Sequence, residues 1–279
     1  SDVVAHFNDS LQTTRLSFNA ILGEVRFPSG NFGLRDLRIS EGPGRLIGIM
    51  GASGSGKTTL LNVLAGWIQP EKGEIRINGL DLHRDKDRIH GVIGYVSQDD
   101  LLIEELTVYQ NLYYNARLCF ANLTEAGIDE RVMEVLRNLG LDQRKDLRVG
   151  STLAKTISGG QRKRLNIALE LIREPAILFL DEPTSGLSSR DSENVIDLLK
   201  ELSLKGKLIF VVIHQPSSDI YKMFDKMIIM DMGGYAAYYG PPVEAITYFK
   251  RSTHQVDSNR GHCKTCGDVN PEQIFNIME

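Results

Sequence analysis

The 279-residue sequence contains only three cysteines, too few for the disulfide framework of a small secreted domain. It has no run of about 18 or more apolar residues, so we expect no helix of this chain to span a membrane. Positive charge is not in excess, because the formal net charge is -4, and we therefore expect no nucleic-acid partner. Internal repeats, low-complexity tracts and a signal-peptide pattern are absent as well. These absences favour a soluble protein of the reducing cytoplasm.

Apolar segments that alternate with helical patterns run through most of the chain. Short apolar runs predict β-strands at 16–27, 34–39, 46–50, 74–78, 92–96, 176–180, 208–213, 227–230 and 236–239. Apolar residues at helical spacing predict a helix from Lys57, a mainly helical insert over 107–139 and a helix over 191–203. Because continuous apolar strands that alternate with helices form parallel sheets covered on both faces, we predict an α/β fold with a mainly parallel core sheet.

A glycine-rich loop follows the strand predicted at 46–50. Four residues separate its first glycine from Gly-Lys-Thr, as in the phosphate-binding P-loop pattern, and it reads Gly51-Ala52-Ser53-Gly54-Ser55-Gly56-Lys57-Thr58-Thr59. The glycines let successive backbone N–H groups point at phosphate oxygens, and the following helix adds the positive end of its dipole. Lys57 is expected to reach the β- and γ-phosphates and Thr58 to hold Mg²⁺. A flexible turn is the alternative, and the order of strand, loop and helix favours the P-loop.

Two neighbouring acids follow the strand predicted at 176–180. Asp181 and Glu182 in the segment AILFLDEP lie at the carboxyl edge of the predicted sheet, where ligands bind in open α/β folds. Asp181 is expected to hold Mg²⁺, and Glu182 is expected to orient and polarise the attacking water. The alternative is that Asp-Glu-Pro only ends a strand and begins a turn, and the presence of the P-loop favours the functional interpretation.

The segment ISGGQRKRLNIALELI carries two glycines immediately before a predicted helix. Its residues Ser158, Gly159, Gly160 and Gln161, followed by a basic helix, resemble the signature motif of the ATP-binding cassette (ABC) ATPases. The resemblance implies that ATP and Mg²⁺ are the cofactors, and that this segment binds the γ-phosphate of ATP held by a second nucleotide-binding domain. Taken alone, the segment could be a loop and a helix cap.

Two further motifs of that family occur in the expected order. Gln98 in YVSQDD resembles the Q-loop glutamine, and His214 in VVIHQP resembles the switch histidine. The resemblance implies that Gln98 contacts Mg²⁺ and the water, and that His214 contacts the γ-phosphate. Both would act with Lys57 and Glu182 in catalysis. A lone histidine after a strand is more often a structural hydrogen bonder, but five motifs in order favour the functional role.

The resemblance covers nearly the whole chain and implies a P-loop NTPase fold of the ABC ATPase type, with an antiparallel β part and a helical subdomain. By position, Phe27 is the expected aromatic residue that stacks on adenine, and Phe32 is the alternative. We expect three parts. A core with its β part covers 1–98 and 175–250, a helical subdomain with the signature motif covers 99–174, and a C-terminal tail covers 251–279.

Finer features are similar to the G subfamily, in which the nucleotide-binding domain precedes the membrane domain. The segments concerned are IMGASGSGKTTLLNVLAG, DDLLIEELTVYQNL, HQPSSDIYKMFDKM and NPEQIFNIME. The similarity implies the motor domain of an exporter at the cytoplasmic face of the cell membrane, with a transmembrane domain as its partner. Because the chain begins with Ser1 and the Asn-Pro segment of that subfamily lies just before the membrane domain, we expect a piece of a longer transporter.

One position departs from the family pattern. After the Asp-Glu pair the family reads Ser-x-Leu-Asp, whereas this chain has Ser188 at the fourth position and no carboxylate there. That loop links the two active sites in the family, so we expect loose coupling between them. In the tail, His254, His262, Cys263 and Cys266 could form a zinc site or a redox pair, but a single Cys-x2-Cys pair favours an ordinary surface loop.

Two other functions fit the same motifs. A non-transport ABC ATPase acting on DNA or ribosomes usually carries coiled-coil arms or tandem cassettes, and neither occurs in this acidic chain. A regulatory cassette with little hydrolysis is the second alternative. The presence of Lys57, Glu182 and His214 argues against it.

Overall fold

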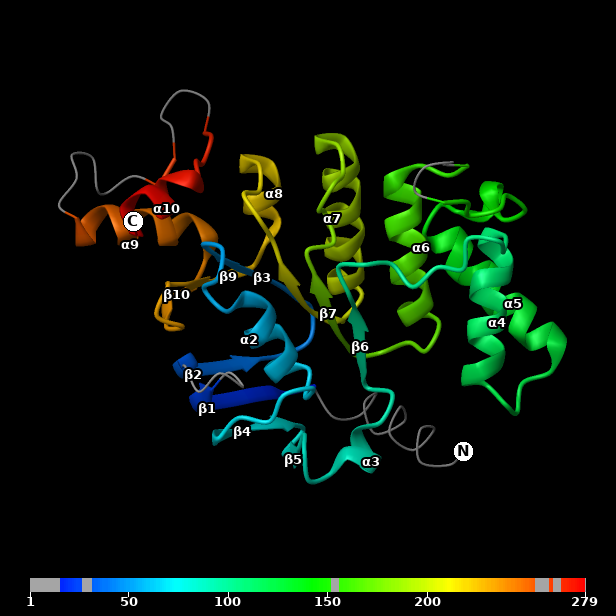
Figure 1. Ribbon diagram of the computed structural model, residues 1–279, viewed down its shortest axis with the longest axis horizontal. Helices are drawn as coiled ribbons and strands as arrows, with labels where there is room; N and C mark the ends of the chain where they lie inside the picture. Colours follow the sequence, from blue (N-terminus) through cyan, green and yellow to red (C-terminus); the bar gives the residue numbers. More distant parts are fainter. Residues whose placement is uncertain (1–15, 27–31, 152–155, 254–260, 263–266, 279) are drawn as a thin grey trace.

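A six-stranded sheet lies at the centre of the computed structural model, which describes residues 16–26, 32–151, 156–253, 261–262 and 267–278 (Figure 1). Its strand order is β10-β9-β3-β8-β7-β6, and all neighbours are parallel except β10, which is antiparallel to β9. The strands are β3 (Arg45–Gly51), β6 (Ile93–Val96), β7 (Ile177–Asp181), β8 (Leu208–Val212), β9 (Lys226–Met230) and β10 (Ala236–Gly240). The predicted parallel core sheet is therefore confirmed.

A smaller antiparallel sheet covers part of one face of the central sheet. Its order is β2-β1-β4-β5, and its strands are β1 (Phe18–Arg26), β2 (Phe32–Glu41), β4 (Lys72–Ile77) and β5 (Leu80–Asp81). Phe18 of β1 packs against Phe179 of β7 and Phe210 of β8, with ring centroids 6.2 and 5.4 Å away. These rings join the small sheet to the large one in a single apolar layer.

Helices cover both faces of the central sheet. On the face with the small sheet lie α2 (Lys57–Leu64) and α3 (Lys86–Ile89), whereas the opposite face carries α6 (Gly159–Leu171), α7 (Ser189–Leu204) and α8 (Ser218–Met223) (Figure 1). Along β7, Ile177 and Phe179 belong to the first apolar layer, and Leu178 and Leu180 belong to the second. This alternation explains why the strand is apolar at every position and buried on both faces.

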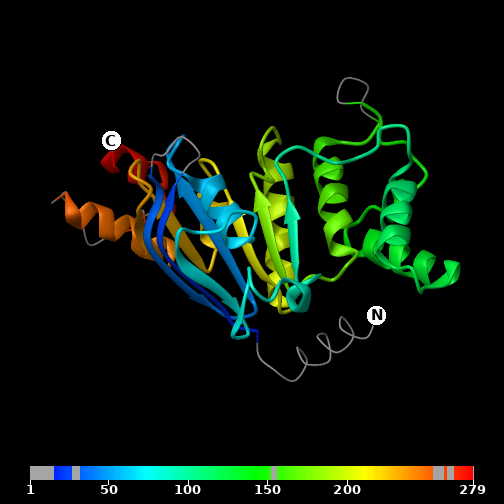
Figure 2. The same cartoon turned by 60° about the horizontal axis from the view of Figure 1, so that its bottom comes forward.

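The remaining helices lie at the two ends of the sheet. At one end, α4 (Val108–Cys119) and α5 (Glu125–Asn138) pack with α6 beyond β6, followed by a short 3-10 helix η1 (Asp142–Arg144) (Figure 2). At the other end lie α9 (Pro242–Ser252) and α10 (Glu272–Met278). In the part of the chain that the structure describes, no helix is long and apolar enough to cross a membrane.

The predicted elements are found with shifts of a few residues at their ends. The helical insert predicted over 107–139 is two helices, because Thr124 accepts a hydrogen bond from the Gly127 N–H and begins α5. The short elements β5, α3 and α8 and the late helices α9 and α10 are not among the elements predicted from the sequence. Four of these five have eight or fewer residues, which is too short for a clear periodicity.

Candidate nucleotide-binding site

The loop between β3 and α2 needs glycine at several positions. A Cβ at Gly51 would lie 2.5 Å from Ser55 Oγ and 2.6 Å from the Met230 carbonyl oxygen, so no side chain fits there. Gly54 and Gly56 have φ values of +80° and +94°, which favour glycine. The loop therefore turns back tightly over the carboxyl end of β3.

Helix α2 begins without a side-chain cap at Gly56. Helices α4, α5, α6 and α7 instead begin with a serine or threonine whose oxygen accepts a backbone N–H, whereas α9 also begins without a side-chain cap, after Pro241. The first N–H groups of an α-helix have no partner within the helix. At α2 they are left for an external acceptor, and an anion such as phosphate fits them.

The ammonium group of Lys57 lies inside the loop. It donates to the carbonyl oxygens of Gly51 and Ala52 at 3.0 and 2.9 Å, and the residue is 6% exposed. Burial lowers the pKa of Lys57, and the nearby carboxylates of Glu182 and Asp181 oppose that shift. Phosphate oxygens next to this amine would stabilise its charged form further.

Asp181 ends β7 directly beside the start of α2. Its Oδ1 accepts a hydrogen bond from Thr58 Oγ1 at 3.3 Å. Burial raises the pKa of the Asp181 carboxyl, and the Thr58 hydrogen bond and the charge of Lys57 act in the opposite direction. A hydroxyl and a carboxylate oxygen are ligands that suit Mg²⁺, so the pair fits the predicted metal site.

Glu182 and His214 face each other across the same edge of the sheet. Glu182 Oε1 lies 3.5 Å from His214 Nε2, and the two residues follow the neighbouring parallel strands β7 and β8. Glu182 has a φ of +44° and Gln215 a φ of +36°, conformations that side chains rarely adopt. Glu182 and His214, which follow separate strands, thus come together at this edge of the sheet.

A pocket of about 240 Å³ opens at this edge. Its lining combines the P-loop with the acid and histidine from the strand ends, and consists of Ser53, Gly54, Gly56, Lys57, Thr58, Thr59, Glu182 and His214. The remaining predicted residues lie outside that lining. Gln98 follows β6, the neighbour of β7, and is exposed. Ser158 begins α6, where its side chain and that of Gln161 form a capping box.

Some predicted residues lie outside the described part of the chain. These are Phe27, His254, Cys263 and Cys266, together with the side chain of the alternative aromatic residue Phe32. His262 is exposed, and among the described residues no group of three metal-binding side chains occurs.

The strand, glycine-rich loop, helix and the acids at the neighbouring strand end define the class of P-loop nucleotide-binding proteins. Comparison with known sequences gives the family. The family model described as ABC transporter matches residues 34–185, which is more than half of the chain, and one described as ABC-2 type transporter matches residues 214–259. The chain belongs to the ABC transporter family and is a nucleotide-binding domain close to the G subfamily.

Similar proteins include members of that subfamily. ABC transporter G family member 22 of Arabidopsis thaliana is 40% identical over 214 residues, covering 75% of this chain and 28% of its own length. The broad substrate specificity ATP-binding cassette transporter ABCG2 of Bos taurus is 41% identical over 204 residues, covering 72% of this chain and 30% of its own length. The chain therefore spans less than a third of the length of these relatives.

A solved structure has the same fold. The structure of cbiO1 from Clostridium perfringens, part of the ABC transporter complex cbiONQ, superposes with a TM-score of 0.73 at 24% identity. The superposition covers 86% of this chain and 95% of that one. It supports the ABC ATPase fold predicted from the sequence.

Proposed function

We propose that this chain binds Mg-ATP at the P-loop and hydrolyses it as the motor domain of a membrane exporter. The observation that carries the proposal is the pocket at the edge of the sheet, where Lys57 and Thr58 meet Glu182 and His214. Asp181 completes the set through its hydrogen bond with Thr58. These residues thus provide a cation for phosphate, oxygen ligands for a metal and a carboxylate for the attacking water.

Each side chain has one task in this proposal. The P-loop N–H groups and Lys57 bind the phosphates, and Thr58 and Asp181 hold Mg²⁺ with Gln98 as a further ligand. When held by these residues, Mg²⁺ would supply positive charge to offset the charge on the transferred phosphoryl group. Glu182 accepts a hydrogen bond from the attacking water and polarises it, while His214 contacts the γ-phosphate.

A second copy of the cassette completes the site in this proposal. Ser158, Gly159, Gly160 and Gln161 would bind the γ-phosphate held by the partner cassette, since none of them lines the pocket of their own chain. The similarity to the G subfamily supports three further parts of the proposal. The direction of transport is export, the partner is a transmembrane domain, and the chain lies at the cytoplasmic face of the membrane.

The decisive variant is Glu182→Gln, which removes the carboxylate and keeps the volume of the side chain. ATP binding should persist, and turnover should slow by about two to four orders of magnitude, the range of general-base catalysis. With ATP trapped, the variant should accumulate as a dimer in size-exclusion chromatography, whereas the unchanged chain should be mostly monomeric. Steady-state phosphate release gives the turnover.

Glu130→Gln is a matched control, because Glu130 is exposed on α5 and distant from the pocket lining. It should hydrolyse ATP at the rate of the unchanged chain. If Glu182→Gln also hydrolyses at that rate, the base lies elsewhere. If the unchanged chain binds ATP without turnover, the regulatory cassette becomes the better description.

A further inference from the structure

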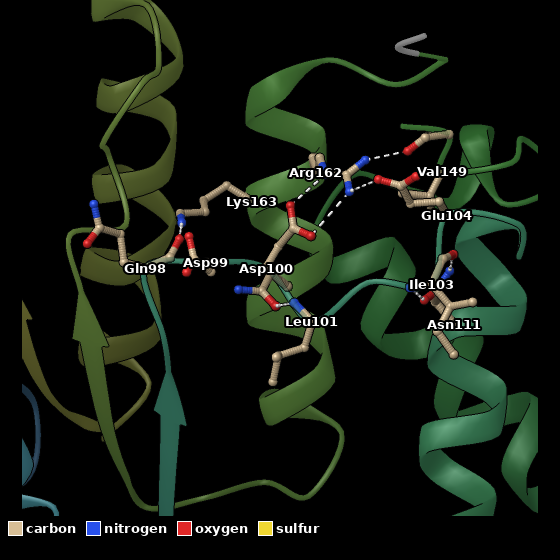
Figure 3. Close-up of polar contacts among 12 residues, drawn as sticks. Gln98, Asp99, Asp100, Leu101, Ile103, Glu104, Asn111, Val149, Arg162 and Lys163 are labelled. Atoms are coloured by element: carbon tan, nitrogen blue, oxygen red, sulfur yellow. Dashed lines mark hydrogen bonds and ion pairs between the residues drawn. The ribbon is translucent and has the colours of Figure 1, made fainter. Parts of the chain in front are cut away.

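The segment that follows β6, residues 98–104, is attached to helix α6 through side chains of that helix (Figure 3). Lys163 Nζ donates to the Gln98 carbonyl oxygen at 2.6 Å, and Asn166 Oδ1 accepts the Leu101 N–H at 3.2 Å. In Figure 3 the Gln98 side chain points away from this cluster while its carbonyl faces Lys163. The main chain on both sides of Asp100 is thus fixed to one helix.

Arg162 makes the most contacts in this cluster. Its Nε lies 2.5 Å from Asp100 Oδ2 and its Nη2 lies 3.2 Å from Asp100 Oδ1, a bidentate ion pair. Nη1 donates to the Gly150 carbonyl oxygen at 2.6 Å, and Nη2 lies 3.6 Å from Glu104 Oε1. The side chains of Arg162 and Asp100 are 11% and 22% exposed, so their ion pair is largely shielded from water, whereas Glu104 is 43% exposed.

The same helix begins with the signature segment. Ser158 Oγ accepts the Gln161 N–H at 3.2 Å, and Gln161 Oε1 accepts the Ser158 N–H at 2.9 Å, so the first turn of α6 is fixed immediately before Arg162. A helix with satisfied backbone bonds moves as a unit. A displacement of the Gln98 segment would reach the signature segment through the Lys163 contact and through the ion pair of Asp100 with Arg162.

We propose that Arg162 is a positioning residue for ATP hydrolysis, which fixes the Gln98 segment to the signature helix through Asp100. The inference rests on the proposed function, because Gln98 and the signature segment act there on opposite nucleotides. A buried ion pair adds little to stability compared with well-packed apolar residues. Its physical use here is geometric, since the planar guanidinium fixes the carboxylate in one orientation.

The test compares ATP affinity with turnover in Arg162→Lys and Asp100→Asn. Arg162→Lys keeps the charge and loses the bidentate geometry, and Asp100→Asn keeps the volume and loses the charge. Each should bind ATP within about threefold of the unchanged affinity and lose about 10- to 100-fold in kcat, the size of effect expected from a small misplacement of reacting groups. Asp100→Glu, which restores a carboxylate, should recover part of the turnover.

A second readout concerns the signature segment itself. In the Glu182→Gln background, either variant should lower the fraction of ATP-dependent dimer. The double variant Arg162→Lys with Asp100→Asn should cost no more than the larger single effect, because both changes break one contact. A stability role alone would instead lower the melting temperature and ATP affinity together, which would overturn the proposal.

A matched control lies next to the tested residues. Arg164 is on the same helix and donates to the Leu139 carbonyl oxygen at 3.0 Å. Arg164→Lys should leave kcat unchanged. If Arg162→Lys also leaves kcat and the dimer fraction unchanged, this proposal fails while ATP hydrolysis stands. If the unchanged chain does not hydrolyse ATP, the proposed function fails first. Should Asp100→Asn not fold, Arg162→Lys carries the test.

Discussion

At the scale of single residues, the Lys57 amine has hydrogen-bond partners within its own loop. Its amine is nearly buried, and the carbonyl oxygens of Gly51 and Ala52 hold it within the loop that it belongs to. The carboxylates of Asp181 and Glu182 lie close enough to favour its protonated form. In the proposed site, phosphate oxygens would replace these carbonyl oxygens as partners of an amine that already lies within the loop.

Lys57→Ala should weaken Mg-ATP binding by more than about tenfold and abolish hydrolysis. The reason is that a hydrogen bond to a charged group contributes about 1.5–3 kcal/mol. Isothermal titration calorimetry measures the affinity. Lys205→Ala serves as control, since that side chain is 56% exposed at the end of α7 and forms an ion pair with Glu201. An unchanged affinity in Lys57→Ala would remove the P-loop assignment.

Ser188 occupies the position where the family has an aspartate, and the structure gives it a local partner. Its Oγ accepts the Asp191 N–H at 3.1 Å and donates to Asp191 Oδ2 at 3.1 Å, so it caps helix α7. Aspartate and asparagine cap helices as well as serine does. Either residue can therefore accept the same N–H, and an aspartate there would lie next to the Asp191 carboxylate.

Ser188→Asp should raise ATPase activity or steepen its dependence on protein concentration, because a carboxylate supports hydrogen bonds about twice as strong as those of a neutral group. The measurement is the steady-state rate across a range of chain concentrations. Ser188→Asn separates charge from capping, since it keeps the cap and adds no charge. Equal rates and equal concentration dependence in both variants would show that coupling does not depend on this carboxylate.

At the scale of elements, two helices of the described part of the chain begin with a capping box. Ser158 with Gln161 begins α6, and Thr107 with Gln110 begins α4, and in both pairs each side chain accepts the backbone N–H of the other residue. Capping alone would make the two pairs equivalent. Only the first pair belongs to the signature motif, so the two helices provide a comparison within one molecule.

Ser158→Ala and Thr107→Ala should each lower the free energy of unfolding by about 0.5–2 kcal/mol, the usual contribution of a cap. Only Ser158→Ala should also reduce the ATP-dependent dimer in the Glu182→Gln background. Urea unfolding and size-exclusion chromatography measure the two effects. If both variants lose the dimer equally, the signature serine acts through helix stability and not through a contact with nucleotide.

At the scale of the whole molecule, the central sheet separates two apolar layers. Leu60, Leu61 and Leu64 of α2 pack in the layer with the small sheet, whereas the layer on the other face includes Leu165 and Ile167 of α6. The two helices that carry the nucleotide motifs are thus packed on opposite faces of one sheet. Ligand binding at the P-loop should therefore stabilise the chain through α2 and the strand ends.

Mg-ATP at about 100 times its dissociation constant should stabilise the folded Glu182→Gln chain by about 2.7 kcal/mol, as mass action requires. Denaturant unfolding with and without nucleotide measures this difference. Chelation of Mg²⁺ by EDTA should reduce the stabilisation, because Thr58 and Asp181 then have no metal to hold. A stabilisation that survives chelation unchanged would contradict the assigned metal site.

The sequence alone determined the features that depend on neighbouring residues. The P-loop and the acids after β7 were predicted from the chemistry of short motifs, and the signature segment was predicted from its resemblance to the ABC family. The order of strands and helices was also predicted, since a strand buried on both faces is apolar throughout. The short elements β5, α3, α8 and α10 were not predicted because they offer too few apolar positions to define a period, whereas α9 was missed although Ala245, Ile246 and Phe249 recur at helical spacing.

Only the tertiary structure decided which of these motifs meet. It brought Glu182 to His214 at 3.5 Å and Thr58 to Asp181 at 3.3 Å, contacts that join residues distant in sequence. It also revealed the pairing of Arg162 with Asp100, which no motif indicated because the two are 62 positions apart. The physical reason is that parallel strands end at one edge of a sheet, and this edge collects side chains that the sequence keeps separate.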